Sequence, residues 1–306
     1  MLQRARGLDV DCVAFDLEDS VTPGMKAEAR SHIGRALAQP RAPGVREQAV
    51  RINSVESGLA YEDLMAVLKY PTIDSIVIPK VNAASDVQYV ADVIQHVQST
   101  SSYDRPKPMH ILALVESAKG LVSLPSICAS SPYLNGLIFA AEDFALDLSL
   151  TRTPSLTEFL YARSAIVTAC RAHDLPSAID LVCTWYGGKM TVRSGEEGRV
   201  PAQRILEEES RAGKGLGFNG KQCIHPSQVE IVQRAFSPDE GELRWAVRVV
   251  VAAEKADAMG RGAWGLDGKM IDAPVVGKAR FLVEKGVACG IDVELLRTQW
   301  KDQEPE

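Results

Sequence analysis

The sequence has no long apolar run, no closely paired cysteines and no excess of positive charge. No stretch approaches the roughly 20 apolar residues of a membrane-spanning helix, which excludes a membrane protein. Lysine and arginine number 34 against 40 aspartate and glutamate, so no basic face for nucleic acid is expected. The six cysteines are scattered without a CxxC pair, which favours inert thiols in a reducing compartment.

The composition is that of a soluble globular protein, with 46% hydrophobic and 24% charged residues. A chain of 306 residues is long enough to bury a large core. It has room for a single α/β barrel of roughly 250 residues or for two smaller domains.

Short apolar runs typical of buried strands alternate with amphipathic helical runs. Continuous apolar strands joined by helices favour a parallel sheet that is covered on both faces. The expected strands are Val10–Leu17, Ala49–Asn53, Ser75–Pro79, Ile111–Val115, Gly136–Ala140, Ala178–Val182 and Lys221–Ile224. The expected helices are Met25–Ala38, Leu59–Lys69, Ala84–Val97, Leu121–Cys128, Thr157–His173 and Val200–Ala212.

The seven expected strands fit two architectures. A closed (β/α)₈ TIM barrel needs eight strands, and Met1–Gly7 resembles the tail of a helix that runs into the first strand. The simplest barrel therefore lacks its first strand at the N-terminus. The alternative is an open doubly wound sheet, which needs no eighth strand.

The pattern changes after the last expected strand. Leu243–Met259 predicts a long helix, Gly260–Pro274 is Gly-rich and predicts a loop, and a last helix is expected near Pro274–Val283. The final residues, Lys301–Glu306, have the composition of a frayed tail. We therefore expect a barrel domain over residues 1–235 and a C-terminal helical extension over residues 236–306. Tyr186–Glu208 predicts an exposed excursion between two strands.

Charged and polar residues follow the ends of the expected strands. They are Asp16, Glu18 and Asp19 after the first strand, Arg51 in the second, Lys80 after the third, Glu116 and Ser117 after the fourth, Glu142 and Asp143 after the fifth, and His225 after the last. The carboxyl ends of parallel strands meet at one rim, where α/β enzymes keep their chemistry.

Carboxylates gathered at one rim repel one another unless a positive charge lies among them. Oxygen ligands suit Mg²⁺ or Mn²⁺, and Mg²⁺ commonly takes only one or two protein carboxylates. Arg51 supplies a fixed cation that can hold a substrate carboxylate through two parallel hydrogen bonds. The rim therefore predicts a metal-assisted reaction on an acidic substrate.

Each residue also has a purely structural interpretation. Any one carboxylate could cap a helix, a role that suits Ser117 and Asp143. Lys80 is equally a solvated or a substrate-facing residue, and His225 is interpreted as orienting a loop. Asp272 could form a turn or cap a helix, and its spacing alone favours the turn.

Seven motifs in order carry a resemblance to a known family. They are DCVAFDLEDSVTPGMKAEAR, AVRINSVESGL, IVIPKV, LVESAKGL, FAAEDF, GFNGKQCIHPSQ and GKMIDAP, and the match runs from residue 1 to about residue 285. Together they resemble the CoA-ester lyases of the citrate lyase β-subunit and malyl-CoA lyase family. The family begins with a strand that is absent here, and Tyr186–Glu208 is longer than its equivalent.

The resemblance implies a (β/α)₈ barrel assembled as a homotrimer. It implies that Glu116 and Asp143 hold Mg²⁺, with Mn²⁺ as a substitute, and that Glu116 also faces the substrate. Arg51 would bind the keto-acid carboxylate. Glu18 and Asp19 would lie behind the metal and orient its waters. Asp272 would be the general acid and base, reaching into a neighbouring subunit's site.

The implied reaction is cleavage of a 3-hydroxyacyl-CoA, such as citramalyl-CoA or malyl-CoA, to a 2-keto acid and acetyl-CoA. Acyl-CoA and keto acids are then the expected partners. The alternatives are a malyl-CoA thioesterase, a CoA-independent pyruvate aldolase and a non-catalytic binding module. The first ten residues carry no targeting pattern. The resemblance implies a mitochondrial location for a eukaryotic source and a cytoplasmic one otherwise.

Overall fold

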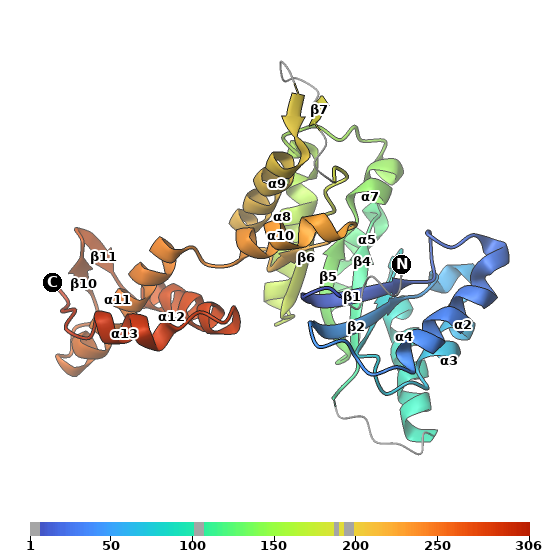
Figure 1. Cartoon of the computed structure of the whole chain (residues 1–306), viewed down its shortest axis with the longest axis horizontal. Helices are drawn as coiled ribbons and strands as arrows, with labels where there is room; N and C mark the ends of the chain where they lie inside the picture. Colours follow the sequence, from blue (N-terminus) through green and yellow to red (C-terminus); the bar gives the residue numbers. More distant parts are fainter. Residues whose placement is uncertain (1–6, 101–106, 187–189, 193–198) are drawn as a thin grey trace. The chain divides into compact units, whose positions relative to one another are not determined.

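A parallel sheet of seven strands forms the centre of the first of two compact units, Met1–Val232 and Gln233–Glu306 (Figure 1). The computed structural model describes residues 7–100, 107–186, 190–192 and 199–306. The strands are β1 (Val10–Asp16), β2 (Val45–Arg51), β3 (Ser75–Ile78), β4 (His110–Val115), β5 (Leu134–Phe139), β6 (Ser177–Asp180) and β9 (Gly220–Lys221). All seven expected strands are confirmed, with ends that differ by a few residues.

The strand order decides between the two expected architectures. Neighbouring strands pair in the order β1-β2-β3-β4-β5-β6-β9, and every pair is parallel. A doubly wound sheet reverses its strand order at a switch point, and this sheet has none. The sheet is therefore wound in one direction, as in a barrel. Within the described residues its two outer strands, β1 and β9, do not pair with each other.

Helices follow the strands along the chain. They are α2 (Lys26–Leu37), α3 (Ala60–Val67), α4 (Ala84–Thr100), α5 (Ala118–Val122), α6 (Leu124–Cys128), α7 (Ala141–Leu148), α8 (Leu160–Ala172), α9 (Ala202–Leu216) and α10 (Val229–Phe236). The single helix expected over Leu121–Cys128 is wrong: α5 and α6 are separate. Pro125 lies in the first turn of α6, where it cannot continue a preceding helix.

The two faces of the sheet bury different side chains. One face carries an apolar cluster of Ala49, Val77, Leu112, Leu114 and Ile138. The opposite face packs on helices, with α8 against β5 and β6 and α9 against β9. β3, β4 and β5 are largely apolar and buried, which explains why the sequence located them well. β1 and β2 also carry exposed polar residues such as Asp11 and Arg46.

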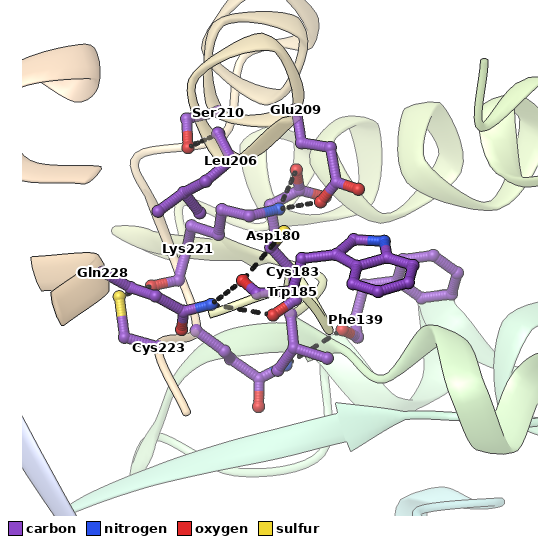
Figure 2. Close-up of polar contacts among 12 residues, drawn as sticks. Phe139, Asp180, Cys183, Trp185, Leu206, Glu209, Ser210, Lys221, Cys223 and Gln228 are labelled. Carbon is purple, nitrogen blue, oxygen red and sulfur yellow. Dashed lines mark hydrogen bonds and ion pairs between the residues drawn. The ribbon is translucent and has the colours of Figure 1, made fainter. Parts of the chain in front are cut away.

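Ionic side chains are buried where this sheet meets α8 and α9. Asp180 is fully buried and accepts two hydrogen bonds from Arg163, at 3.0 Å from Nε and 2.7 Å from Nη2. Lys221 Nζ lies 3.9 Å from Asp180 Oδ2 and 3.3 Å from Glu209 Oε2. Figure 2 shows the Lys221 ammonium between these two carboxylates. These side chains pack between strands and helices, away from the apolar face.

The second unit holds α11 (Glu240–Ala258), α12 (Ala273–Ala288) and α13 (Val293–Gln299). The four apolar positions that predicted its long helix, Ala246, Val249, Val250 and Ala253, all lie in its core. Asp239 and Glu242 form a capping box that starts α11.

The loop expected over Gly260–Pro274 is wrong. β10 (Trp264–Leu266) and β11 (Lys269–Ile271) pair there as an antiparallel hairpin. Its two turn residues, Asp267 and Gly268, have φ angles of 52° and 71°, as a type I′ turn requires. The tail is not frayed either, because Glu306 exchanges backbone hydrogen bonds with Gly265 at 2.9 and 3.0 Å.

Three further features that the sequence analysis raised can be compared with the structure. In the excursion over Tyr186–Glu208, β7 (Met190–Val192) pairs with β8 (Arg199–Pro201), and residues 187–189 and 193–198 lie outside the described residues. All six cysteines are unpaired. No helix in the described part of the chain combines the length and apolarity needed to cross a bilayer.

Two glycines of α9 give a matched stability test. A Cβ on Gly213 would press into Asp180 Oδ2, which the buried pair with Arg163 holds in place, whereas nothing lies within 4 Å of a Cβ on Gly215. Gly213→Ala should destabilise the fold by about 1–3 kcal/mol, as overpacking does. Gly215→Ala should stabilise it by about 0.5–1 kcal/mol. Urea unfolding of both variants measures this, and equal effects would contradict the packing described.

Candidate active site and metal centre

Arg51 and Asp16 form a fixed pair at the carboxyl ends of the first two strands. The parallel register sets the two residues side by side. Arg51 donates from Nε to Oδ1 and from Nη2 to Oδ2, both at 2.7 Å. Burial alone raises the pKa of Asp16, but the hydrogen bonds from Arg51 and Ser20 outweigh it and lower the pKa to about 2. Asp16 therefore remains a carboxylate that orients the guanidinium.

The other edge of Arg51 faces the remaining carboxylates. Its Nη1 lies 2.9 Å from Glu18 Oε2, and its side chain is 27% exposed. Nη1 also lies 3.9 Å from Asp19 Oδ2. Only the two contacts with Asp16 are hydrogen bonds, and Glu18 Oε2 has no hydrogen-bond partner among the described residues. Both terminal nitrogens therefore keep N–H groups that no described residue accepts. A planar edge of this kind can hold an incoming carboxylate through two hydrogen bonds.

Lys80 joins two carboxylates through different atoms. Its backbone N–H donates to Glu116 Oε1 at 2.6 Å, and its Nζ donates to Glu18 Oε1 at 2.8 Å. The φ angle of Lys80 is 52°, a left-handed conformation that non-glycine residues rarely adopt. Burial lowers the pKa of Lys80, but its contacts with Glu18 outweigh this and raise it to about 12. Lys80 is therefore a permanent cation of this cluster.

Among the carboxylates of this rim, the charges of Glu116 and Asp143 are the least balanced by positive groups and hydrogen bonds. Glu116 follows β4 and is buried, and Asp143 lies half-buried in the first turn of α7. Burial, together with the charges of Asp143 and Glu18, raises the pKa of Glu116 to about 7 against the opposing hydrogen bond from Lys80. The Asp143 carboxylate makes no hydrogen bond or ion pair with another described residue.

The charges of this rim do not balance. Five carboxylates, Asp16, Glu18, Asp19, Glu116 and Asp143, meet two cations, Arg51 and Lys80, which leaves an excess of three negative charges when all are ionised. A divalent cation would reduce that excess to one.

The ligand set is open rather than complete. Among the residues that the structure describes, no group of three or more His, Cys, Asp or Glu gathers as a metal cage. Two carboxylates are nevertheless the usual protein share of a Mg²⁺ site, whose other positions go to water and substrate. Glu116 and Asp143 fit such an ion because they are close enough to repel and are short of positive partners.

The structure brings together Glu18, Asp19, Arg51, Glu116 and Asp143 at one rim of the first unit. Asp272 belongs to the second unit, where it caps α12 by accepting the Val275 N–H at 3.2 Å. The turn favoured for Asp272 from its spacing is wrong, and the alternative local role, a helix cap, is present. Its relation to the cluster is a proposal taken up below.

Several structural roles were also expected at this rim. Ser117 caps α5 through the N–H of Gly120, as expected. Asp143 does not cap α7, because Ala140 occupies the N-cap position. His225 accepts the backbone N–H of Ser227 at 3.2 Å, which agrees with a loop-orienting residue.

No individual role for Asp16 was predicted from the sequence, and the role of Lys80 was left undecided. Asp16 and Arg51 each lie at the carboxyl end of a strand, and this was the available signal for their pairing. The strand register that sets them side by side cannot be read from the sequence. The contacts of Lys80 depend on its positive φ, which no sequence pattern around it indicates.

Residues 1–226 match the family model described as HpcH/HpaI aldolase/citrate lyase. The chain belongs to this family. It is 33% identical to human mitochondrial citramalyl-CoA lyase, an alignment that covers 92% of this chain and 80% of the human protein. It is 31% identical to (3S)-malyl-CoA thioesterase of Cereibacter sphaeroides, over 94% of this chain and 90% of that protein.

A solved structure of similar fold comes from the same family. It is the protein CitE of Mycobacterium tuberculosis in complex with magnesium, acetoacetate and coenzyme A. The TM-score is 0.69 and the sequence identity 27%, over 93% of this chain and 92% of that one.

The raised pKa of Glu116 predicts an unusual pH dependence for the metal-free HpcH/HpaI-family protein. The folded-state pKa of Glu116 is about 7, above the ordinary value of 4.5, so the folded protein binds this proton more tightly than the unfolded chain does. The free energy of unfolding therefore falls as pH rises from 4.5 to 7. Glu116→Gln should therefore stabilise the protein at pH 8 by roughly 2–3 kcal/mol and have little effect at pH 5. Denaturant unfolding in EDTA measures the difference.

The matched control for this test is Glu207→Gln, which removes an α9 carboxylate that pairs with the exposed Arg211. It should change stability equally at both pH values. A destabilised Glu116→Gln protein at pH 8 would mean that the carboxylate is compensated after all.

Proposed function

We propose that the chain is a divalent-metal-dependent CoA-ester lyase that cleaves a 3-hydroxyacyl-CoA to a 2-keto acid and acetyl-CoA. Citramalyl-CoA and malyl-CoA are the proposed substrates. The observation that carries the proposal is the undercompensated Glu116–Asp143 pair beside the open edge of Arg51. The human relative that bears the name citramalyl-CoA lyase supports the substrate class.

Each side chain has a role in this reaction. Arg51 would bind the carboxylate that becomes part of the keto acid, and Asp16 would keep the guanidinium in place. Glu116 and Asp143 would hold Mg²⁺ or Mn²⁺, which supplies Lewis-acid stabilisation of charge on the substrate oxygen. Glu18 and Asp19 would accept hydrogen bonds from water in the site.

The bond changes balance without an added reagent. The substrate hydroxyl gives its proton to solvent water as its oxygen becomes the keto oxygen, and the adjacent carbon–carbon bond breaks. The electron pair of that bond forms the enolate of acetyl-CoA, which takes a proton at carbon. Asp272 is the proposed acid, and in the condensing direction it would remove that proton. The enolate needs strong electrostatic stabilisation, because its carbon acid is weak.

We further propose that the seven described strands belong to a (β/α)₈ barrel over residues 1–235. Residues 236–306 would be a C-terminal extension, and the chain would assemble as a homotrimer. Asp272 would then serve the site of a neighbouring subunit. A mitochondrial location is proposed for a eukaryotic source, by likeness to the human relative, and a cytoplasmic one otherwise.

The direct test is product formation from (3S)-citramalyl-CoA and malyl-CoA. Pyruvate or glyoxylate and acetyl-CoA should appear in equal amounts with Mg²⁺, and EDTA should abolish the release. Glu116→Gln should lower the rate at least 100-fold while the protein stays folded, because a carboxamide is a poor ligand for Mg²⁺. Turnover that is unaffected by EDTA would contradict the metal-dependent reaction.

A thioesterase that acts on malyl-CoA is the second candidate, since the Cereibacter sphaeroides relative bears that name. The same metal site would serve it, with water attacking the thioester carbonyl. The products separate the two candidates: a thioesterase releases malate and free CoA, and a lyase releases no free thiol.

Subunit exchange tests the proposed role of Asp272. Asp272→Asn and Glu116→Gln should each be inactive alone, because one lacks the proton donor and the other a metal ligand. Co-expressed as mixed oligomers, they should regain part of the activity, since some sites combine an intact Asp272 with an intact Glu116. Mixed oligomers without activity would contradict a site shared between subunits.

A further inference from the structure

The first turn of α7 carries Asp143 but has no capping side chain. Ala140 occupies its N-cap position and has no side chain that can accept a hydrogen bond from the first turn. An uncapped first turn leaves backbone N–H groups without partners and is prone to fray. Something else must therefore hold Asp143 opposite Glu116.

Side chains of α7 anchor the helix on either side of Asp143. Asp147 accepts the backbone N–H of Ala118 at 2.8 Å, and this ties the last turn of α7 to the segment that follows Glu116. Glu142, immediately before Asp143, pairs with Arg152. The backbone N–H of Ala140 also donates to the Val115 carbonyl oxygen at 3.1 Å, which joins the start of α7 to the end of β4. Among the side-chain hydrogen bonds and ion pairs of the described residues, the pair with Arg152 is the one made from the first turn.

Arg152 is itself held from three directions. Besides Glu142, its guanidinium donates to Glu209 Oε1 at 2.9 Å and to the carbonyl oxygen of Val182 at 3.1 Å. The Arg152 side chain is 18% exposed and that of Glu209 only 6%. Arg152 therefore connects the first turn of α7 to α9 and to the segment just after β6.

The contacts continue inward as a row of alternating charge. Glu142, Arg152, Glu209, Lys221, Asp180 and Arg163 follow one another as ion pairs. Figure 2 shows the inner part of this row, where Lys221 reaches both Glu209 and Asp180. Three negative and three positive charges compensate one another. A buried row of this kind resists displacement, because moving one member leaves its neighbour's charge buried and unpaired.

We propose that Arg152 is a positioning residue for the metal carboxylate Asp143. It transfers the rigidity of the buried row to the first turn of α7 and so fixes the separation of Asp143 from Glu116. This rests on the proposed metal site. It goes beyond that site because neither Arg152 nor Glu142 touches substrate or metal. Residues behind metal ligands typically change metal affinity about 10- to 100-fold when they are replaced.

The test measures Mn²⁺ binding directly, by calorimetric titration of the full-length protein with MnCl₂. Arg152→Gln should weaken Mn²⁺ binding about tenfold or more. Arg211→Gln is the matched control, since it removes an exposed α9 arginine paired with Glu207, and it should bind as wild type does. Asp143→Asn should abolish binding and marks the ligand itself.

A milder variant separates positioning from folding. Glu142 is 51% exposed, so Glu142→Gln removes the same link at the surface and leaves the buried row intact. It should weaken Mn²⁺ binding several-fold with an unchanged melting temperature. If Arg152 acts through Glu142, the double variant should bind Mn²⁺ no more weakly than Arg152→Gln alone.

The outcomes distinguish the two proposals. A wild-type protein that does not bind Mn²⁺ would remove the proposed metal site and this inference with it. Wild-type affinity in folded Arg152→Gln and Glu142→Gln, with binding lost in Asp143→Asn, would overturn the positioning role alone. Should Arg152→Gln fail to fold, the affinity of Glu142→Gln decides.

Discussion

The excess of negative charge at one rim of the sheet governs the rest of this site. Parallel strands deliver their carboxyl ends to one edge, and here they deliver five carboxylates and two cations. Repulsion among such groups must be relieved by hydrogen bonds, by proton uptake or by a bound cation. Hydrogen bonds from Arg51 relieve the repulsion at Asp16, whereas the pKa of Glu116, raised to about 7, favours proton uptake. A bound divalent cation would relieve the repulsion that remains.

The two charged clusters of the first unit differ in a way that separates structure from function. The row from Glu142 to Arg163 has equal numbers of positive and negative groups and is largely buried, so its charges compensate one another. The rim cluster is unbalanced and partly open, as a binding site must be before its ligand arrives. Arg152 and Glu142 join the two, because Glu142 precedes Asp143 in one helical turn.

The sequence predicts what depends on composition and misses what depends on pairing. The central strands β3, β4 and β5 were found because their residues are largely apolar and buried, and the rim carboxylates because strand ends converge. The Asp16–Arg51 pair and the charged row were missed, since they need the register and the helix packing. The β10–β11 hairpin was missed although Asp267-Gly268 is a strong turn signal, because the neighbouring glycines suggested a loop.

Lys80 shows why a strained residue can be the right one at this rim. A left-handed conformation costs a non-glycine residue of order 1–3 kcal/mol, and glycine would avoid that cost. Glycine could keep the backbone contact to Glu116 but would leave Glu18 without its ammonium partner. Glu18 is buried and its pKa is already raised by burial, so losing Lys80 would favour its protonation further. A lysine with positive φ thus serves both carboxylates at once, through its backbone N–H and its ammonium.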